Sequence, residues 1–234
     1  MKKIILTSLL AFAAGQIIAA DAKEEVSAAI KKLADKNNYS WTSESRSEGG
    51  QGRFGSFNST GKKDGDIVVI ASEAGGNTFE VARKGEKVAI KRDGSWQNPE
   101  DFGGGEQGRG FGRAFAQDPV AQAEETLKEV KSLKKEGDAY VGQLTDAGIA
   151  ALASPFRRGQ NAQGPQVSNG SGSVKFWIKD GVLSKMESNV KGRLTFTRDG
   201  QSQERDIDTT RSVEFKNVGT TKVELPQEAR DKIS

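Results

Sequence analysis

The chain has 234 residues, of which 29% are charged and 34% hydrophobic, and it contains no cysteine and no histidine. These absences exclude disulfide bonds, Ser-His-Asp and Cys-His catalysis and the usual His/Cys zinc sites. Residues 1–20 hold two of the 35 basic residues and none of the 32 acidic ones, so the remainder is nearly neutral. A nearly neutral protein has no long-range field to gather nucleic acid or anionic lipid, and we expect no nucleic-acid partner.

Residues 1–22 have the layout of a secretion signal. A positive start precedes an uncharged stretch from Ile4 to Ala14, and small residues follow at Ala20 and Ala22. The apolar stretch is too short to span a bilayer core of about 30 Å. We therefore expect a signal peptide cleaved after Ala20 or Ala22. The protein is then periplasmic or extracellular, and peripheral to a membrane at most.

Two longer segments have the period of an amphipathic helix. In residues 21–37, apolar side chains recur at Val26, Ile30 and Leu33. A second helix is expected from Asp118 and Pro119, an N-cap and first-turn pair, to about residue 135. Its apolar stripe consists of Ala123, Leu127, Val130 and Leu133. Shorter helical segments are expected over 146–153 and 227–233.

Alternating polar and apolar residues predict strands through most of the remaining chain. The expected strands cover residues 39–44, 54–60, 66–71, 78–83, 87–91, 138–144, 173–179, 182–197, 205–216 and 221–225. The turns between the early strands are short, which requires antiparallel pairing. The fold class is therefore α+β, with one large antiparallel sheet whose packed face is covered by helices.

Glycine-rich stretches interrupt this pattern. Residues 103–112 and 157–172 are expected to be flexible loops. The spacing G-x-G-x-x-G occurs at 50–55 and 103–108, but neither match opens a helix, as a dinucleotide site requires. The Arg-Gly segments within these loops resemble RNA-binding tracts, but export and near-neutral charge favour a mobile surface loop.

Few residues are candidates for chemistry. Asp206 and Asp208 lie two apart on an expected strand, so both carboxylates face one side about 6.6 Å apart. Glu214 and Lys216 share that side, which favours a solvated face over a catalytic pair. We expect no enzyme activity, no metal site and no cofactor. Trp177 shares a face with lysines, so it is half-covered by a helix, lines a cleft or is a lone exposed aromatic, and the last is the commonest arrangement.

Four segments carry a family resemblance. They are YSWTSES (39–45), GDIVVIASEAGGNTFEVARKGEKVAIKRDGSW (65–96), GSVKFWIKDGVLSKMESNVKG (172–192) and VELPQEA (223–229). Together they resemble the periplasmic lipoprotein-carrier superfamily, the LolA/LolB and LppX/LprG-like proteins. The resemblance implies a single domain over 23–234, in which a curved antiparallel half-barrel wraps helices around a hollow for acyl chains. The chain departs from the family in lacking an anchoring cysteine and in its insert at 103–112.

The resemblance also implies a site and a partner. The expected ligand-binding face consists of Trp41, Val174, Phe176, Ile178, Met186, Val190 and Phe196. The implied function is to bind an apolar ligand, an acyl chain or a lipoprotein, between sheet and helices. The alternative is a non-enzymatic structural or protein-interaction component of the cell envelope. A carboxylate enzyme ranks third. The same alternating residues line a hollow core and a filled one, so the sequence leaves that choice open, as it does the oligomeric state.

Overall fold

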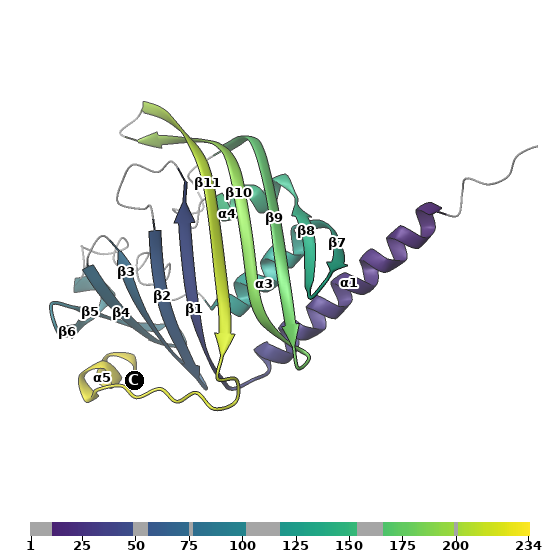
Figure 1. The fold of residues 1–234 in the computed structure, drawn as a ribbon. Helices are drawn as coiled ribbons and strands as arrows, with labels where there is room; N and C mark the ends of the chain where they lie inside the picture. Colours follow the sequence, from purple (N-terminus) through teal and green to yellow (C-terminus); the bar gives the residue numbers. More distant parts are fainter. Residues whose placement is uncertain (1–10, 49–55, 75–76, 102–117, 154–165, 199–200) are drawn as a thin grey trace, which may run out of the picture.

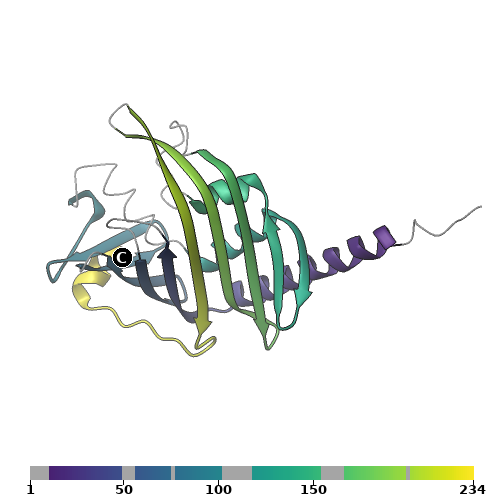
Figure 2. The ribbon, with the colours of Figure 1, turned by 45° about the horizontal axis from the view of Figure 1, so that its top comes forward.

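The computed structural model describes residues 11–48, 56–74, 77–101, 118–153, 166–198 and 201–234. In these ranges all strands form one antiparallel sheet in the order β6-β5-β4-β3-β2-β1-β11-β10-β9-β8-β7. Their bounds are β1 (Asn38–Ser47), β2 (Ser56–Asp64), β3 (Ile67–Ala74), β4 (Asn77–Lys84), β5 (Lys87–Arg92), β6 (Ser95–Gln97), β7 (Val130–Glu136), β8 (Ala139–Leu144), β9 (Gln166–Lys179), β10 (Val182–Arg198) and β11 (Gln201–Lys216). The sheet is strongly curved (Figures 1 and 2).

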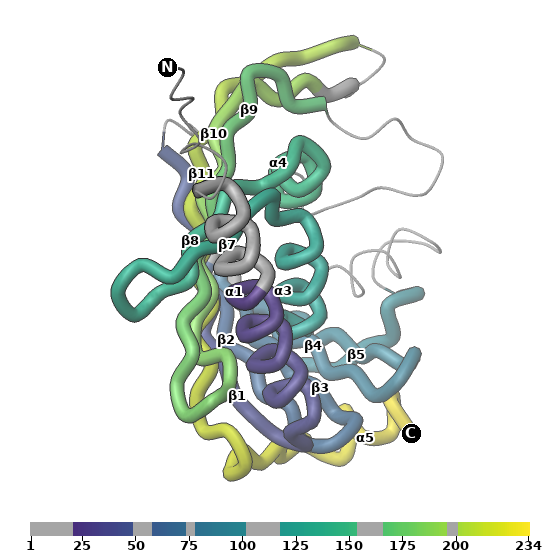
Figure 3. The backbone as a smooth tube through the Cα atoms, turned by 90° about the vertical axis from the view of Figure 1, so that its right-hand side faces the viewer, coloured from purple at the N-terminus to yellow at the C-terminus, as the bar shows by residue number. Residues whose placement is uncertain are grey.

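Helices cover both faces of this sheet, but in different places. The inner face carries α1 (Ala11–Ala34), α3 (Pro119–Lys128) and α4 (Asp146–Ala153), with α1 and α4 packed on β7–β10 and α3 packed on α1 (Figure 3). The outer face carries α5 (Gln227–Ile233) over β4–β6, and a short 3-10 turn lies at Pro99–Asp101. The expected α+β class, a curved antiparallel half-barrel covered by helices, is confirmed. Within the described ranges no helix is both long and apolar enough to cross a membrane.

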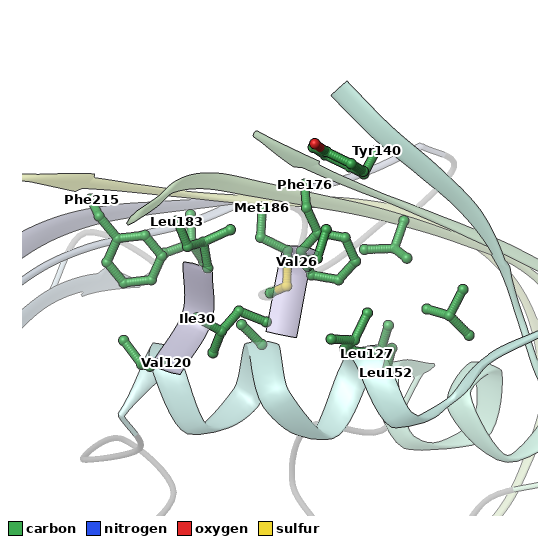
Figure 4. Packing of buried hydrophobic residues seen from close by; sticks show 14 of the residues in the cluster. Val26, Ile30, Val120, Leu127, Tyr140, Leu152, Phe176, Leu183, Met186 and Phe215 are labelled. Atoms are coloured by element: carbon green, nitrogen blue, oxygen red, sulfur yellow. The ribbon is translucent and has the colours of Figure 1, made fainter. Parts of the chain in front are cut away.

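The larger core lies between the sheet and the inner helices (Figure 4). Val26, Ile30 and Leu33 of α1 are buried, as their helical spacing predicted. They pack in one cluster with inner-face side chains such as Phe176 and Met186. A second, smaller core lies under α5 and contains Ala82, Ala89, Trp96, Leu225, Ala229 and Ile233.

The second amphipathic helix is shorter than the sequence predicts. It ends at Lys128, and Val130 and Leu133 lie on β7 instead. Both side chains are buried although three positions separate them, because a register shift between Val130 and Ser132 keeps them on one face of the strand. This bulge produces the spacing of a helix within a strand. The expectation of one helix to residue 135 was therefore wrong.

Two further segments differ from expectation. Residues 166–172, expected as part of a loop, form the first half of β9. Their glycines allow close packing, since a Cβ at Gly172 would lie 2.9 Å from side-chain atoms of Ile149 and Leu144. Residues 221–225 form no strand but lead to α5 without regular secondary structure, with Val223 N donating to Asp64. Loop residues 103–112 and 157–165 lie outside the described part of the chain.

Candidate functional site

The helix-covered half of the inner face is filled by the protein's own side chains. Val174, Phe176, Met186 and Val190 share this face, as predicted, and each is at most 4% exposed. They belong to one cluster with side chains of α1, α3 and α4. Figure 4 shows Phe176 and Met186 pointing from the sheet toward Val26 of α1. Here the sheet and the helices contact each other directly.

Three other predicted site residues lie at different places. Trp41 is buried on the inner face of β1, at the centre of the sheet. Ile178 is half-buried and packs against the edge of the main core. Phe196 lies on β10 opposite Gln203, and its side chain is outside the described set. Trp41 nevertheless belongs to the same core cluster as Val174 and Phe176, so six of the seven predicted residues lie in or against one core.

Trp41 lies flat against a glycine on the neighbouring strand. An added Cβ at Gly61 would be 2.0 Å from the Trp41 ring, so no other residue fits there without moving the indole. Tyr39 packs beside it, with ring centroids 5.9 Å apart. The position of the indole therefore depends on a glycine that the sequence analysis did not single out.

The inner face continues as an apolar row across β1 to β5, and two of its side chains, Trp41 and Ile70, belong to the main core under the inner helices. The strand registers align Trp41, Gly61, Ile70, Val81 and Ile90 in this order. All four side chains of this row are buried. Sequence analysis placed only Trp41 here, although the alternation of Val68 with Ile70, and of Val88 with Ile90, was available as a signal.

A row with charged side chains borders the apolar row. Tyr39, Lys63, Val68, Arg83 and Val88 are aligned across β1 to β5 on the same inner face. Lys63 Nζ is 5.3 Å from the centre of the Tyr39 ring. Two cations therefore lie beside an otherwise apolar surface.

One carboxylate links this charged row to the inner helices. Asp118, the N-cap of α3, accepts hydrogen bonds from Tyr39 Oη at 2.8 Å and from the Val120 amide at 2.9 Å. Lys63 Nζ lies 3.6 Å from the same carboxylate. Burial of the phenol, together with the negative charge of Asp118, raises the pKa of Tyr39 far above its usual value.

Among the described residues, two buried polar atoms of the inner face have no hydrogen-bond partner. Ser72 Oγ and Arg83 Nε are buried and make no hydrogen bond within the described part of the molecule. Ser72 is only 2% exposed and lies on the strand that also carries Ile70. A buried polar group without a partner costs about 1–3 kcal/mol, so such atoms are rare unless a ligand or solvent satisfies them.

The outer face has a polar hollow of about 260 Å³ over β9–β11, and Asp208 lies in it. Lys191 Nζ is 2.7 Å from Asp208, and Asn189 donates to Asp208 at 3.1 Å. Both contacts lower the pKa of Asp208, and the contact with Lys191 has the larger effect. Asp206 pairs instead with Arg193 at 3.0 Å. Both carboxylates are held by cations, which fits the solvated-face interpretation. The described residues contain no group of three or more acidic side chains placed to hold a metal.

A larger hollow of about 720 Å³ lies at one end of β9–β11. Trp177 lines it together with apolar and lysine side chains. The sequence favoured a lone exposed aromatic at Trp177, whereas the structure places this side chain in the lining of a hollow.

Comparisons with known proteins concern the fold alone. No family model matches the chain, and no curated protein matches its sequence. Among solved structures, the lipoprotein LppX of Mycobacterium tuberculosis aligns with a TM-score of 0.46 at 9% identity, over 88% of this chain and 99% of that one. LprF of Mycobacterium bovis aligns with a TM-score of 0.46 at 12% identity, over 90% and 98%.

A third structure, a LolA-superfamily protein of Nitrosomonas europaea, aligns with a TM-score of 0.33 at 11% identity, over 88% of this chain and 96% of that one. The names LppX and LolA are among those of the superfamily that the sequence resembles.

Proposed function

We propose that this chain is an exported, non-enzymatic protein that binds an acyl-type apolar ligand on the inner face of β1–β5. The apolar row of Trp41, Gly61, Ile70, Val81 and Ile90 carries the proposal, because it extends the packed face beyond the strands on which α1 and α4 lie. The row crosses four strand spacings, about 19 Å in all, which suits an extended acyl chain.

The polar atoms around this row support the same location. Lys63 and Arg83 border it on one side, and the unpartnered hydroxyl of Ser72 lies on the other. A ligand that is apolar along its length and polar at its ends would complement this arrangement. Its polar ends would satisfy atoms that have no hydrogen-bond partner among the described residues.

The test uses Trp41 as a reporter. A variant with Trp96→Phe and Trp177→Phe keeps Trp41 as its single tryptophan. Brominated stearic acid, a contact quencher, should reduce the emission of this variant, and unlabelled stearic acid should restore it. The matched control retains only Trp96, which is buried under α5 on the outer face, and its emission should not change.

A structural or protein-interaction role is the second candidate function, and the filled part of the core favours it. Under the inner helices the core is filled, with Val174 and Phe176 fully buried against the protein itself. A completely filled core would suit a structural or protein-interaction component of the cell envelope. If no acyl probe quenches Trp41 while circular dichroism shows a folded sheet, this second function replaces the first.

A further inference from the structure

The hollow around Trp177 combines an aromatic side chain with lysines. Its apolar wall includes Trp177, Val182 and Val218, which are all half-buried. Trp177 lies on β9, Val182 begins β10 and Val218 follows β11, so the wall is built at one end of three adjacent strands (Figure 1). Trp177 lies on the side of Lys175, opposite Phe176, and is not among the described side chains that pack against the main core, whereas Val182 and Val218 are.

Four lysines line the same hollow, against two acidic residues, Asp180 and Glu214. Lys216 pairs with Glu214 at 3.0 Å, and Lys185 lies 4.7 Å from the Trp177 ring centre and pairs with Glu187 at 3.3 Å. The other two, Lys36 and Lys179, have no acidic partner within 4.0 Å among the described residues. The lining therefore has an excess of positive charge and two ammonium groups available to a ligand.

The end of α1 adds further positive charge to this region. Lys31 and Lys32 lie in the last turn of the helix. Lys32 Nζ is 3.1 Å from the position of a Cβ at Gly181, which places it against the β9–β10 turn. Three separate segments thus bring lysines to one end of the molecule.

We infer that this end of the sheet docks on a membrane surface by binding the headgroups of anionic phospholipids. Lysines beside half-buried apolar side chains suit such an interface, since the ammonium groups contact phosphates while the indole lies at headgroup level. A free anion would need the lysines but not the apolar wall. A nearly neutral chain can still dock in this way, because the attraction between these lysines and anionic headgroups acts only within a Debye length of about 10 Å.

The experiment measures co-flotation of the mature protein with vesicles. Vesicles that contain phosphatidylglycerol in phosphatidylcholine should bind the protein, and pure phosphatidylcholine vesicles should not. Each lysine near an anionic surface is worth about fivefold in partition. The double variant Lys36→Gln/Lys179→Gln should therefore bind about 25-fold more weakly than the wild type.

A matched control removes the same charge elsewhere. Lys87 lies after the β4–β5 turn and Lys134 lies on β7, and both are exposed. The variant Lys87→Gln/Lys134→Gln should bind the anionic vesicles as the wild type does. Equal loss in both double variants would overturn the proposal, because it would indicate a non-specific charge effect.

Two further measurements test whether Trp177 contacts the membrane and whether the lysines bind lipid headgroups or free phosphate. Lipids brominated on their acyl chains should quench Trp177 in a variant that lacks Trp41 and Trp96. Absence of this quenching, or complete competition by millimolar inorganic phosphate, would overturn membrane docking. The acyl-binding assay uses fatty acid without vesicles, so failure of one proposal leaves the other intact.

Discussion

Among the described glycines, Gly61 has the closest side-chain neighbour, the indole of Trp41. Gly61→Ala would place a methyl group 2.0 Å from the indole, so the ring or the strand must move. We expect the free energy of unfolding to fall by about 1–3 kcal/mol, as overpacking usually costs. Urea denaturation would measure the loss. In the background Trp41→Phe, where the larger ring is gone, the same glycine substitution should cost clearly less; an equal cost would contradict this explanation.

Ser72 provides a test of the unpartnered hydroxyl. Because Ser72 Oγ is buried without a partner, Ser72→Ala should raise the free energy of unfolding of the ligand-free protein by about 1 kcal/mol. Thr221→Val is the comparison, since the Thr221 hydroxyl donates to Asn217 O at 2.9 Å and its removal should destabilise. Thermal unfolding of the two variants should move in opposite directions. A destabilised Ser72→Ala protein would show that the hydroxyl is already satisfied.

The buried phenol of Tyr39 is expected to make the folded protein less stable in alkaline solution. Burial and the charge of Asp118 raise its pKa in the folded protein, so the folded state retains a proton that the unfolded chain releases at a pH of about 10. Tyr39 therefore makes its full contribution to the free energy of unfolding below a pH of about 10. This contribution decreases as the pH rises further. Tyr39→Phe should be less stable at neutral pH, because the bond to Asp118 is lost, and its stability should change less between neutral and alkaline solution. Urea unfolding at several pH values would measure both effects.

At the scale of elements, α5 closes the second core. Deletion of residues 227–234 removes Ala229 and Ile233 from contact with Trp96. We expect Trp96 emission to shift to the red and the protein to lose about 2–5 kcal/mol of stability, since two buried apolar side chains are removed. The shift should be read in a variant that lacks Trp41 and Trp177. Unchanged Trp96 emission would contradict the assignment of α5 to the outer face.

The elements also show where sequence patterns suffice. Residues 146–153 and 227–233 are helical as predicted, and the alternation in 182–197 and 205–216 correctly marks two long strands. The patterns fail where a backbone irregularity changes the period, as the bulge near Val130 does. They also fail where glycine serves packing instead of a turn, as at Gly172 against α4.

The site was less predictable than the fold. Alternation identified Phe176 and Met186 as inward-facing, which is correct, but it could not show that α1 packs directly on them. The charged row was missed for a similar reason, because Lys63 on β2 and Arg83 on β4 come into one row only through the register of three strands. Register depends on long-range pairing, which local periodicity does not contain.

At the scale of the whole molecule, export predicts a defined mature terminus. The helix α1 runs without a break through the expected cleavage region, and Ala22 is buried in the main core. Cleavage after Ala20 keeps Ala22, whereas cleavage after Ala22 removes it. N-terminal sequencing of protein from a bacterial envelope fraction should therefore find Asp21 or Lys23 first. An intact Met1 in that soluble fraction would contradict export by a cleaved signal.

The strand order has a consequence for how the chain folds. The first strand of the sheet, β1, lies at its centre between β2 and β11, and the Ser40 hydroxyl donates to Lys216 O across 176 positions. Such distant pairing makes closure of the sheet slow. Until the last strand has been synthesised, β1 presents an open edge, which is prone to pair with other chains. A chain truncated before residue 201 is therefore expected to aggregate instead of forming half a sheet.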